Sequence, residues 1–185
     1  MLASSIKQFK YYKQLAEKTI AQTDNVGLFH RFHDDDNTIA IIVQHMSGNM
    51  KSRWTNIFEE DGEKPWRNRD SEFDQIIDTR KEMTVIWDGG WRILFDTLES
   101  LREEDLRRII YIRNEGMTVE DAIIRQLCHY SYHVGQIVYK GKQLSNGTWR
   151  TLSIARNDSK AYNFKKIEQI KEEKHFLDNL LDESP

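Results

Sequence analysis

Cysteine and proline are nearly absent from this sequence. Its 185 residues include one cysteine, Cys128, and two prolines. A single thiol can form neither an intramolecular disulfide, nor a CxxC redox centre, nor a zinc site built from four cysteines. The sequence therefore excludes a disulfide scaffold, and the cytoplasm is the expected location.

Charge of one sign and long apolar runs are also lacking. The 27 Lys and Arg residues nearly balance the 30 Asp and Glu residues, which leaves a formal net charge of −3. Such a balance gives no electrostatic footprint for DNA or RNA. No apolar stretch is long enough to span a bilayer, and the first residues lack the apolar core of an export signal. We therefore expect neither a nucleic-acid partner nor a membrane partner.

The scarcity of helix breakers favours long helices. Nine glycines and two prolines are well below the roughly 12% of average usage. Apolar residues recur at three- and four-residue steps, which predicts amphipathic helices. The predicted helices cover roughly residues 2–23, 38–58, 71–101, 118–144 and 162–182. We therefore predict an all-α fold, and the length favours a single domain over residues 1–185.

Several interruptions in this pattern leave alternatives open. The pair Gly89–Gly90 either kinks the 71–101 helix or separates two helices. Residues 107–113 alternate β-forming side chains before a glycine turn, which predicts at most one short hairpin. Residues 61–70 mix glycine and proline with alternating charges and predict a loop. Gly135 is expected to allow a close contact between helices.

Histidine is the richest chemical resource of the sequence. His129 and His133 stand four residues apart on the most regular predicted helix, so one metal ion can bind both imidazoles. A third ligand must come from another element, and His45, beside the apolar stripe of the 38–58 helix, is the candidate. An HxxxH pair on a helix flank is more often solvent-exposed or a satisfied core pair than a metal site. Cys128 points about 100° away from the next residue on a helix, so we expect a buried thiol rather than a fourth ligand.

Polar residues near these histidines are candidates for a supporting or substrate-binding role. Asn49, one turn after the first histidine, either faces the metal cavity or caps a local helix distortion. Gln136, three residues beyond the last histidine of the pair, is either a hydrogen-bond partner of a ligand or a structural polar contact. Guanidinium groups bind carboxylates and phosphates bidentately. Arg53, Arg67 and Arg69 therefore bind such a group or tie the intervening loop to the helix ends.

Several segments together resemble the DinB-like, or YfiT-like, metalloprotein superfamily. HYSYHVGQIVYKGKQL, residues 129–144, is similar to its last bundle helix, whose signature is H-x3-H followed by Gly-Gln-Ile. QHMSGNMKSRW, residues 44–54, resembles the helix that carries its first histidine. The GNxxSRW and GEKPWRNRD motifs, together with WRTLSIARNDS at 149–159, are similar to an uncharacterised branch. The resemblance covers nearly the whole chain in the expected order.

The resemblance implies a four-helix bundle with an up-down-down-up connection, followed here by an additional C-terminal helix. It also implies a divalent metal ion held by His45, His129 and His133, and zinc or nickel suits imidazole ligands best. Some members are thiol S-transferases, which implies a metal-dependent enzyme of detoxification or stress response acting with a low-molecular-weight thiol. The alternative is a non-catalytic stress or ligand-binding protein with a structural metal. Related bundles commonly pair, so a homodimer is compatible with the resemblance.

Overall fold

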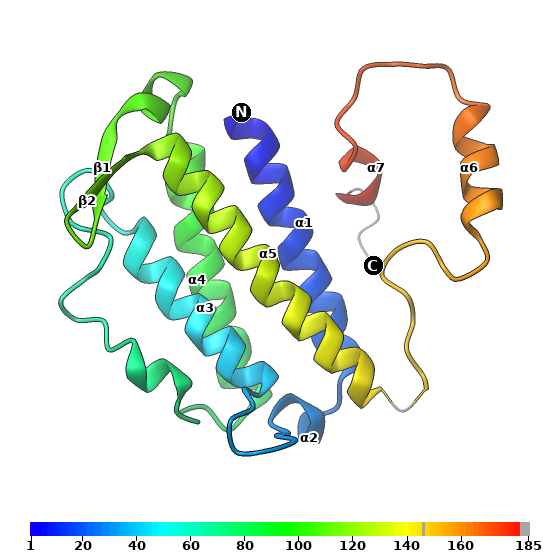
Figure 1. The fold of residues 1–185 in the computed structure, drawn as a ribbon, viewed down its shortest axis with the longest axis horizontal. Helices are drawn as coiled ribbons and strands as arrows, with labels where there is room; N and C mark the ends of the chain where they lie inside the picture. The colour runs from blue at the N-terminus through cyan, green and yellow to red at the C-terminus, as the bar shows by residue number, and fades with distance from the viewer. Residues whose placement is uncertain (146, 182–185) are drawn as a thin grey trace.

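The computed structural model describes residues 1–145 and 147–181 (Figure 1). Within these residues the protein is mostly helical, with one antiparallel hairpin. The elements are α1 (Leu2–Gln22), α2 (Asn25–Leu28), α3 (Ile39–Trp54), η1 (Asp70–Phe73, a 3-10 helix), α4 (Arg80–Ser100), η2 (Glu103–Arg107, a 3-10 helix), β1 (Ile109–Ile112), β2 (Glu115–Thr118), α5 (Val119–Leu144), α6 (Ser159–Ile167) and α7 (Asp178–Leu181). The prediction of a helical bundle with at most one short hairpin is confirmed.

The four long helices α1, α3, α4 and α5 form the bundle. α1 and α5 run parallel, because Phe9 packs on Tyr130 and, further along both helices, Thr19 packs on Gly141. α3 and α4 run together in the opposite direction (Figure 1). This arrangement is the up-down-down-up connection that the resemblance implies.

Threonine side chains define where three of these helices begin. Thr38 accepts a hydrogen bond from the backbone of Ile41 at the start of α3. Thr118 does the same at the start of α5. Thr79 and Glu82 form a reciprocal capping box at the start of α4. Such caps satisfy backbone N–H groups that have no partner within the helix, each stabilising by about 1 kcal/mol.

The prediction for the 71–101 helix is wrong at its beginning. The helix begins only at Arg80, since the capping box fixes its start, and the preceding residues pack against α3 as the 3-10 helix η1 and a loop. α4 runs unbroken through the pair Gly89–Gly90, so the pair does not separate two helices. Gly90 instead lets α4 approach α3 closely, because a Cβ there would lie 3.0 Å from the Cα of Ser47.

The loop between α3 and η1 is fixed to the hairpin at one end of the bundle. α3 ends at Trp54, short of the predicted residue 58, and Asn56 follows with a left-handed φ of 47°. Asp61 accepts hydrogen bonds from the backbone amides of Arg113 and Asn114 at the hairpin turn. Both turn residues have positive φ, as a tight two-residue hairpin turn requires. These contacts bring the predicted loop and the hairpin turn to the same end of α3.

The single C-terminal helix predicted over residues 162–182 is wrong. The structure has two short helices, α6 and α7, with residues 168–177 outside either; residue 182 lies outside the described residues. α6 stands apart from the bundle in Figure 1 and buries none of its residues. Ile167 is 82% exposed, whereas Leu177 is buried near α1. The apolar spacing was present, but most of it has no surface to pack on.

The core lies between the four bundle helices and is rich in aromatic side chains. The Trp91 ring packs against Phe9 and Tyr130, with centroids 6.4 and 6.0 Å apart. None of the helices in the described part of the chain combines the length and apolarity that a bilayer crossing demands.

Candidate metal centre

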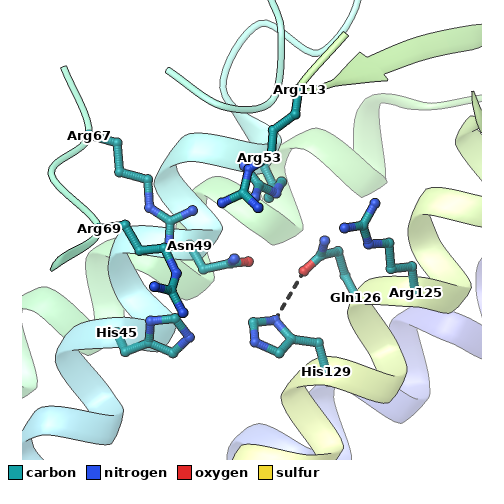
Figure 2. A pocket seen from close by; sticks show the side chains of 9 residues that line it. All are labelled: His45, Asn49, Arg53, Arg67, Arg69, Arg113, Arg125, Gln126 and His129. Carbon is teal, nitrogen blue, oxygen red and sulfur yellow. Dashed lines mark hydrogen bonds between the residues drawn. The ribbon is translucent and has the colours of Figure 1, made fainter. Parts of the chain in front are cut away.

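Two facing stripes of polar side chains lie between α3 and α5. Each stripe has a spacing of four residues, so its members project from one side of their helix. Because the helices are antiparallel, the two stripes oppose each other along the gap (Figure 2). The stripes are His45, Asn49 and Arg53 on α3, and Arg125, His129 and His133 on α5.

The structure brings His45, His129 and His133 together into one group that can hold a metal ion. One candidate ligand atom from each lies within 4.8 Å of the others. The Nε2 atoms of His129 and His133 are 3.0 Å apart. Metal–imidazole bonds of ~2.0–2.1 Å in a tetrahedral site place two such nitrogens ~3.3 Å apart. The spacing of this pair is close to that value, and the three imidazoles together form a group that can hold a metal ion.

The Nδ1 atoms of the two α5 histidines contact glutamine side-chain oxygens. Gln136 Oε1 lies 2.8 Å from Nδ1 of His133, and Gln126 Oε1 lies 3.4 Å from Nδ1 of His129 (Figure 2 shows the second pair). These contacts leave Nε2 of each imidazole for the metal and fix the ring orientation. Gln136 therefore has the position expected of a partner that orients a ligand, and Gln126 is a second such residue that the sequence did not single out.

A buried carboxylate holds the third histidine. Glu72 Oε2 lies 2.9 Å from Nδ1 of His45, and its side chain is only 8% exposed. Arg67 donates two hydrogen bonds to the same carboxylate, at 2.7 and 2.8 Å. Burial alone would raise the pKa of Glu72, but the bonds from Arg67 and His45 hold it below its ordinary value. The carboxylate is therefore ionised and orients His45 for a metal.

Gly48 makes this arrangement sterically possible. A Cβ at that position would clash with the carboxyl group of Glu72. α3 runs unbroken through Gly48, so there is no helix distortion for Asn49 to cap. Sequence reasoning missed Glu72, because it lies on η1, 27 residues from His45. The glycine one turn from that histidine was the sole local signal of a close approach.

The field of the site keeps the α5 imidazoles neutral. Burial, together with the nearby His133 and His45 and the arginines of the site, lowers the pKa of His129 to about 3. Burial also lowers the pKa of His133, partly offset by the hydrogen bond with Gln136. Metal ligation requires neutral imidazole, so both side chains are in the binding form at neutral pH.

Asn49 is fixed by the aromatic core behind the site. The Tyr130 hydroxyl donates to Asn49 Oδ1 at 3.0 Å and accepts from Trp54 Nε1 at 3.2 Å. Tyr130 is fully buried, and burial raises the pKa of its hydroxyl. The Asn49 side chain therefore faces the cavity from a rigid position.

Arg53 meets the second of the alternatives that its position left open, that of tying the loop to the end of α3. Its guanidinium donates to the carbonyl of Gly62 and to Glu63 Oε2, so it ties the loop to the end of α3. It also lines the cavity beside the histidines. The remaining histidines lie away from this centre, and Cys128 is exposed rather than buried, contrary to expectation.

A cavity of about 250 Å³ opens next to the histidines (Figure 2). His45 and His129 form part of its wall, which links it directly to the metal-binding group. The rest of the wall consists of Asn49, Gln126, Arg53, Arg67, Arg69, Arg113 and Arg125. The site is thus a cluster of imidazoles beside a strongly basic chamber.

Comparison with known proteins identifies one family. A family model described as a protein of unknown function (DUF1572) matches residues 1–158. Neither the curated proteins nor the solved structures contain a match to this chain. The matched range contains the four bundle helices, the hairpin and the histidine group, and it ends just before α6.

Proposed function

We propose that this chain, which belongs to the DUF1572 family of proteins of unknown function, is a DinB-like enzyme that depends on a divalent metal ion. His45, His129 and His133 are its proposed ligands, and zinc or nickel is the proposed ion. The observation that carries the proposal is the convergence of three imidazoles whose Nδ1 atoms are each held by a different side-chain oxygen. A solvent-exposed HxxxH pair would need no such supporting partners.

The proposed reaction is the transfer of a low-molecular-weight thiol to an electrophile. A bound divalent ion with an open position supplies a Lewis acid that favours the thiolate form of a thiol. The thiol proton leaves to solvent, a sulfur–carbon bond forms at the electrophile, and the carbon–halogen bond breaks to release halide. The assignment of this reaction rests on the resemblance to DinB-like transferases, since one fold can host many chemistries.

The residues of this chain prepare the site for that reaction. Glu72 and Gln136 hold Nδ1 of His45 and of His133, so both rings are oriented before a metal binds. Asn49, held by Tyr130, presents its amide to the cavity and can hydrogen-bond a bound substrate. The basic wall of the cavity stabilises negative charge, including that of a thiolate.

Metal binding is tested by elemental analysis of protein purified without chelator and by calorimetric titration of zinc and nickel into the metal-free protein. We expect one equivalent per chain for the wild type. His133→Ala should lose it, because two imidazoles hold a metal far more weakly than three. His33→Ala is the matched control, since His33 is exposed and does not belong to the histidine group. Absence of stoichiometric metal, or full retention in His133→Ala, would contradict the proposed centre.

The transferase activity needs a separate assay. Metal-loaded protein is incubated with bacillithiol, mycothiol or glutathione and a chlorinated aromatic electrophile, and the thioether product is measured. We expect turnover by the wild type and His33→Ala but not by His133→Ala. Stoichiometric metal without turnover above His133→Ala, together with a sharp fall in melting temperature on chelation, would instead support the non-catalytic protein with a structural metal.

A further inference from the structure

The arginines around the cavity come from separate parts of the chain and converge on one space. Arg53 ends α3, Arg125 lies on α5, and Arg113 lies at the hairpin turn. Arg67 and Arg69 come from the loop before η1. Their side chains gather around the cavity in Figure 2. Like charges repel, so such a gathering costs free energy unless carboxylates or a bound anion compensate it.

Carboxylates compensate only part of this charge. Glu63 lies 3.0 Å from both Arg53 and Arg113, and Glu72 pairs with Arg67. Asp70 lies 3.7 Å from the guanidinium of Arg69, but its side chain is 97% exposed. Among the described residues that form the cavity wall, none is acidic. The chamber therefore carries an excess of positive charge directed at its interior.

Arg125 has the least compensated of these charges. Its contact with another side chain is a 4.0 Å approach to the sulfur of Met117. No ion pair to it occurs within residues 1–145 and 147–181. Arg125 stands one helical turn from His129, on the same stripe of α5. Its guanidinium is thus available to a ligand next to the metal-binding group.

Within the described part of the chain, two buried guanidinium nitrogens lack a hydrogen-bond partner. They are Nε of Arg53 and Nη1 of Arg67, whose side chains are 6% and 2% exposed; Glu63 Oε1 lies 3.7 Å from the second nitrogen, beyond hydrogen-bond distance. Leaving a buried donor of a charged group unsatisfied is costly. Both side chains line the cavity, where an oxygen of a bound anion can accept from them. These donors distinguish a built anion site from arginines that merely brace a loop.

We propose that this basic chamber binds a small organic oxyanion, the carboxylate or phosphate group of the substrate that reacts at the metal. The assignment of that ligand as the substrate rests on the proposed function. One helical turn separates Arg125 from His129 and two turns separate Arg53 from His45, which correspond to ~6 and ~12 Å along a helix. The substrate class is therefore a small molecule that carries its oxyanion about 6–12 Å from the reacting atom.

The test measures binding of inorganic phosphate, succinate and uncharged succinamide by calorimetry at neutral pH, with both metal-loaded and chelated protein. We expect phosphate or succinate to bind and succinamide not to bind. The anion that binds more tightly identifies the source as phosphate or carboxylate. Arg125→Gln should weaken anion binding ~10-fold or more, since it removes a charge-assisted hydrogen bond. Arg102→Gln is the matched control, because Arg102 is exposed on the surface and does not line the cavity.

Failure of this inference can be distinguished from failure of the metal centre. Anion binding by the chelated protein that is weakened in Arg125→Gln would support the chamber even if no metal bound. Stoichiometric metal without anion binding would overturn the oxyanion inference alone. Equal binding of succinate and succinamide, or equal affinity of Arg125→Gln and wild type, would overturn it as well.

Discussion

The bundle contains two kinds of contact between helices. In the close contacts, α3 meets α4 through Gly90, and α1 meets α5 through Gly141, where an added Cβ would collide with the facing helix. In the open contact, α3 and α5 face each other across histidines and arginines. Gly135 belongs to neither kind of contact: it is exposed and a Cβ there would meet nothing within 4 Å, so the expectation of close packing there is wrong. The close contacts stabilise the bundle, whereas the open contact leaves room for the histidine group and the cavity.

Metal loading should change the open contact most. Metal bound to the folded state alone raises the free energy of unfolding by ~2.7 kcal/mol when its free concentration is 100 times its Kd. We expect a corresponding rise in melting temperature that chelation reverses. His129→Ala should abolish the rise. An unchanged melting temperature in protein shown to hold one equivalent of metal would mean that the unfolded chain binds the metal as tightly as the folded protein does.

A side chain at Gly90 should damage the close contact between α3 and α4. Its Cβ would lie 3.0 Å from the Cα of Ser47, and backbone cannot move aside cheaply. Overpacking of this kind typically costs ~1–3 kcal/mol, so Gly90→Val should lower the free energy of unfolding by about 2 kcal/mol in a urea titration. Gly89→Ala is the matched control, since its Cβ would meet only Lys51 Cε at 3.9 Å. A stable Gly90→Val protein would show that this contact is not closely packed.

The same comparison explains what the sequence could predict about the fold. The helices α1 and α5 were predicted within a residue or two, because their apolar periodicity is continuous and the two helices pack on each other. The start of α4 and the division of the C-terminal segment into two short helices were not predicted. An apolar spacing indicates a stable helix only where its apolar face packs against another part of the protein. Whether such a surface exists depends on the whole fold.

The site divides in the same way. The histidines could be predicted because each lies within a recognisable pattern on a single helix: the HxxxH spacing on α5 and the family-like motif on α3. Glu72 and Arg113 were missed, since they arrive from a loop and a hairpin whose positions no local pattern reveals. Arg125 was within reach, because it stands four residues before His129 and shares its stripe. A search of that stripe in both directions would have identified it.

An ion pair between Asp36, just before α3, and Lys140 on α5 lies at one end of the open contact. It makes the free energy of unfolding depend on pH. Burial opposes ionisation of Asp36, but hydrogen bonds from Lys140 and the Phe32 backbone lower its pKa below the ordinary 3.8. A depressed carboxyl pKa gives stability that is present above the unfolded-state pKa and is lost as pH falls through the folded-state value. Asp36→Asn should therefore lower the free energy of unfolding by about 1 kcal/mol at pH 7. Below pH 5, its free energy of unfolding should fall less steeply with pH than that of the wild type. A parallel decline of both proteins below pH 5 would contradict this.

The smallest expected effect is a gain in stability at Gly135. This residue is exposed in the middle of α5, and an added Cβ meets no atom within 4 Å. Alanine is favoured over glycine by up to ~1 kcal/mol within a helix, so Gly135→Ala should raise the melting temperature slightly. Gly141→Ala is the contrast on the same helix, because the methyl group of Thr19 occupies the space that its Cβ needs. Opposite signs of the two changes in thermal unfolding would separate the exposed face of α5 from its close contact with α1, whereas equal destabilisation would place Gly135 at a packed surface such as a second chain.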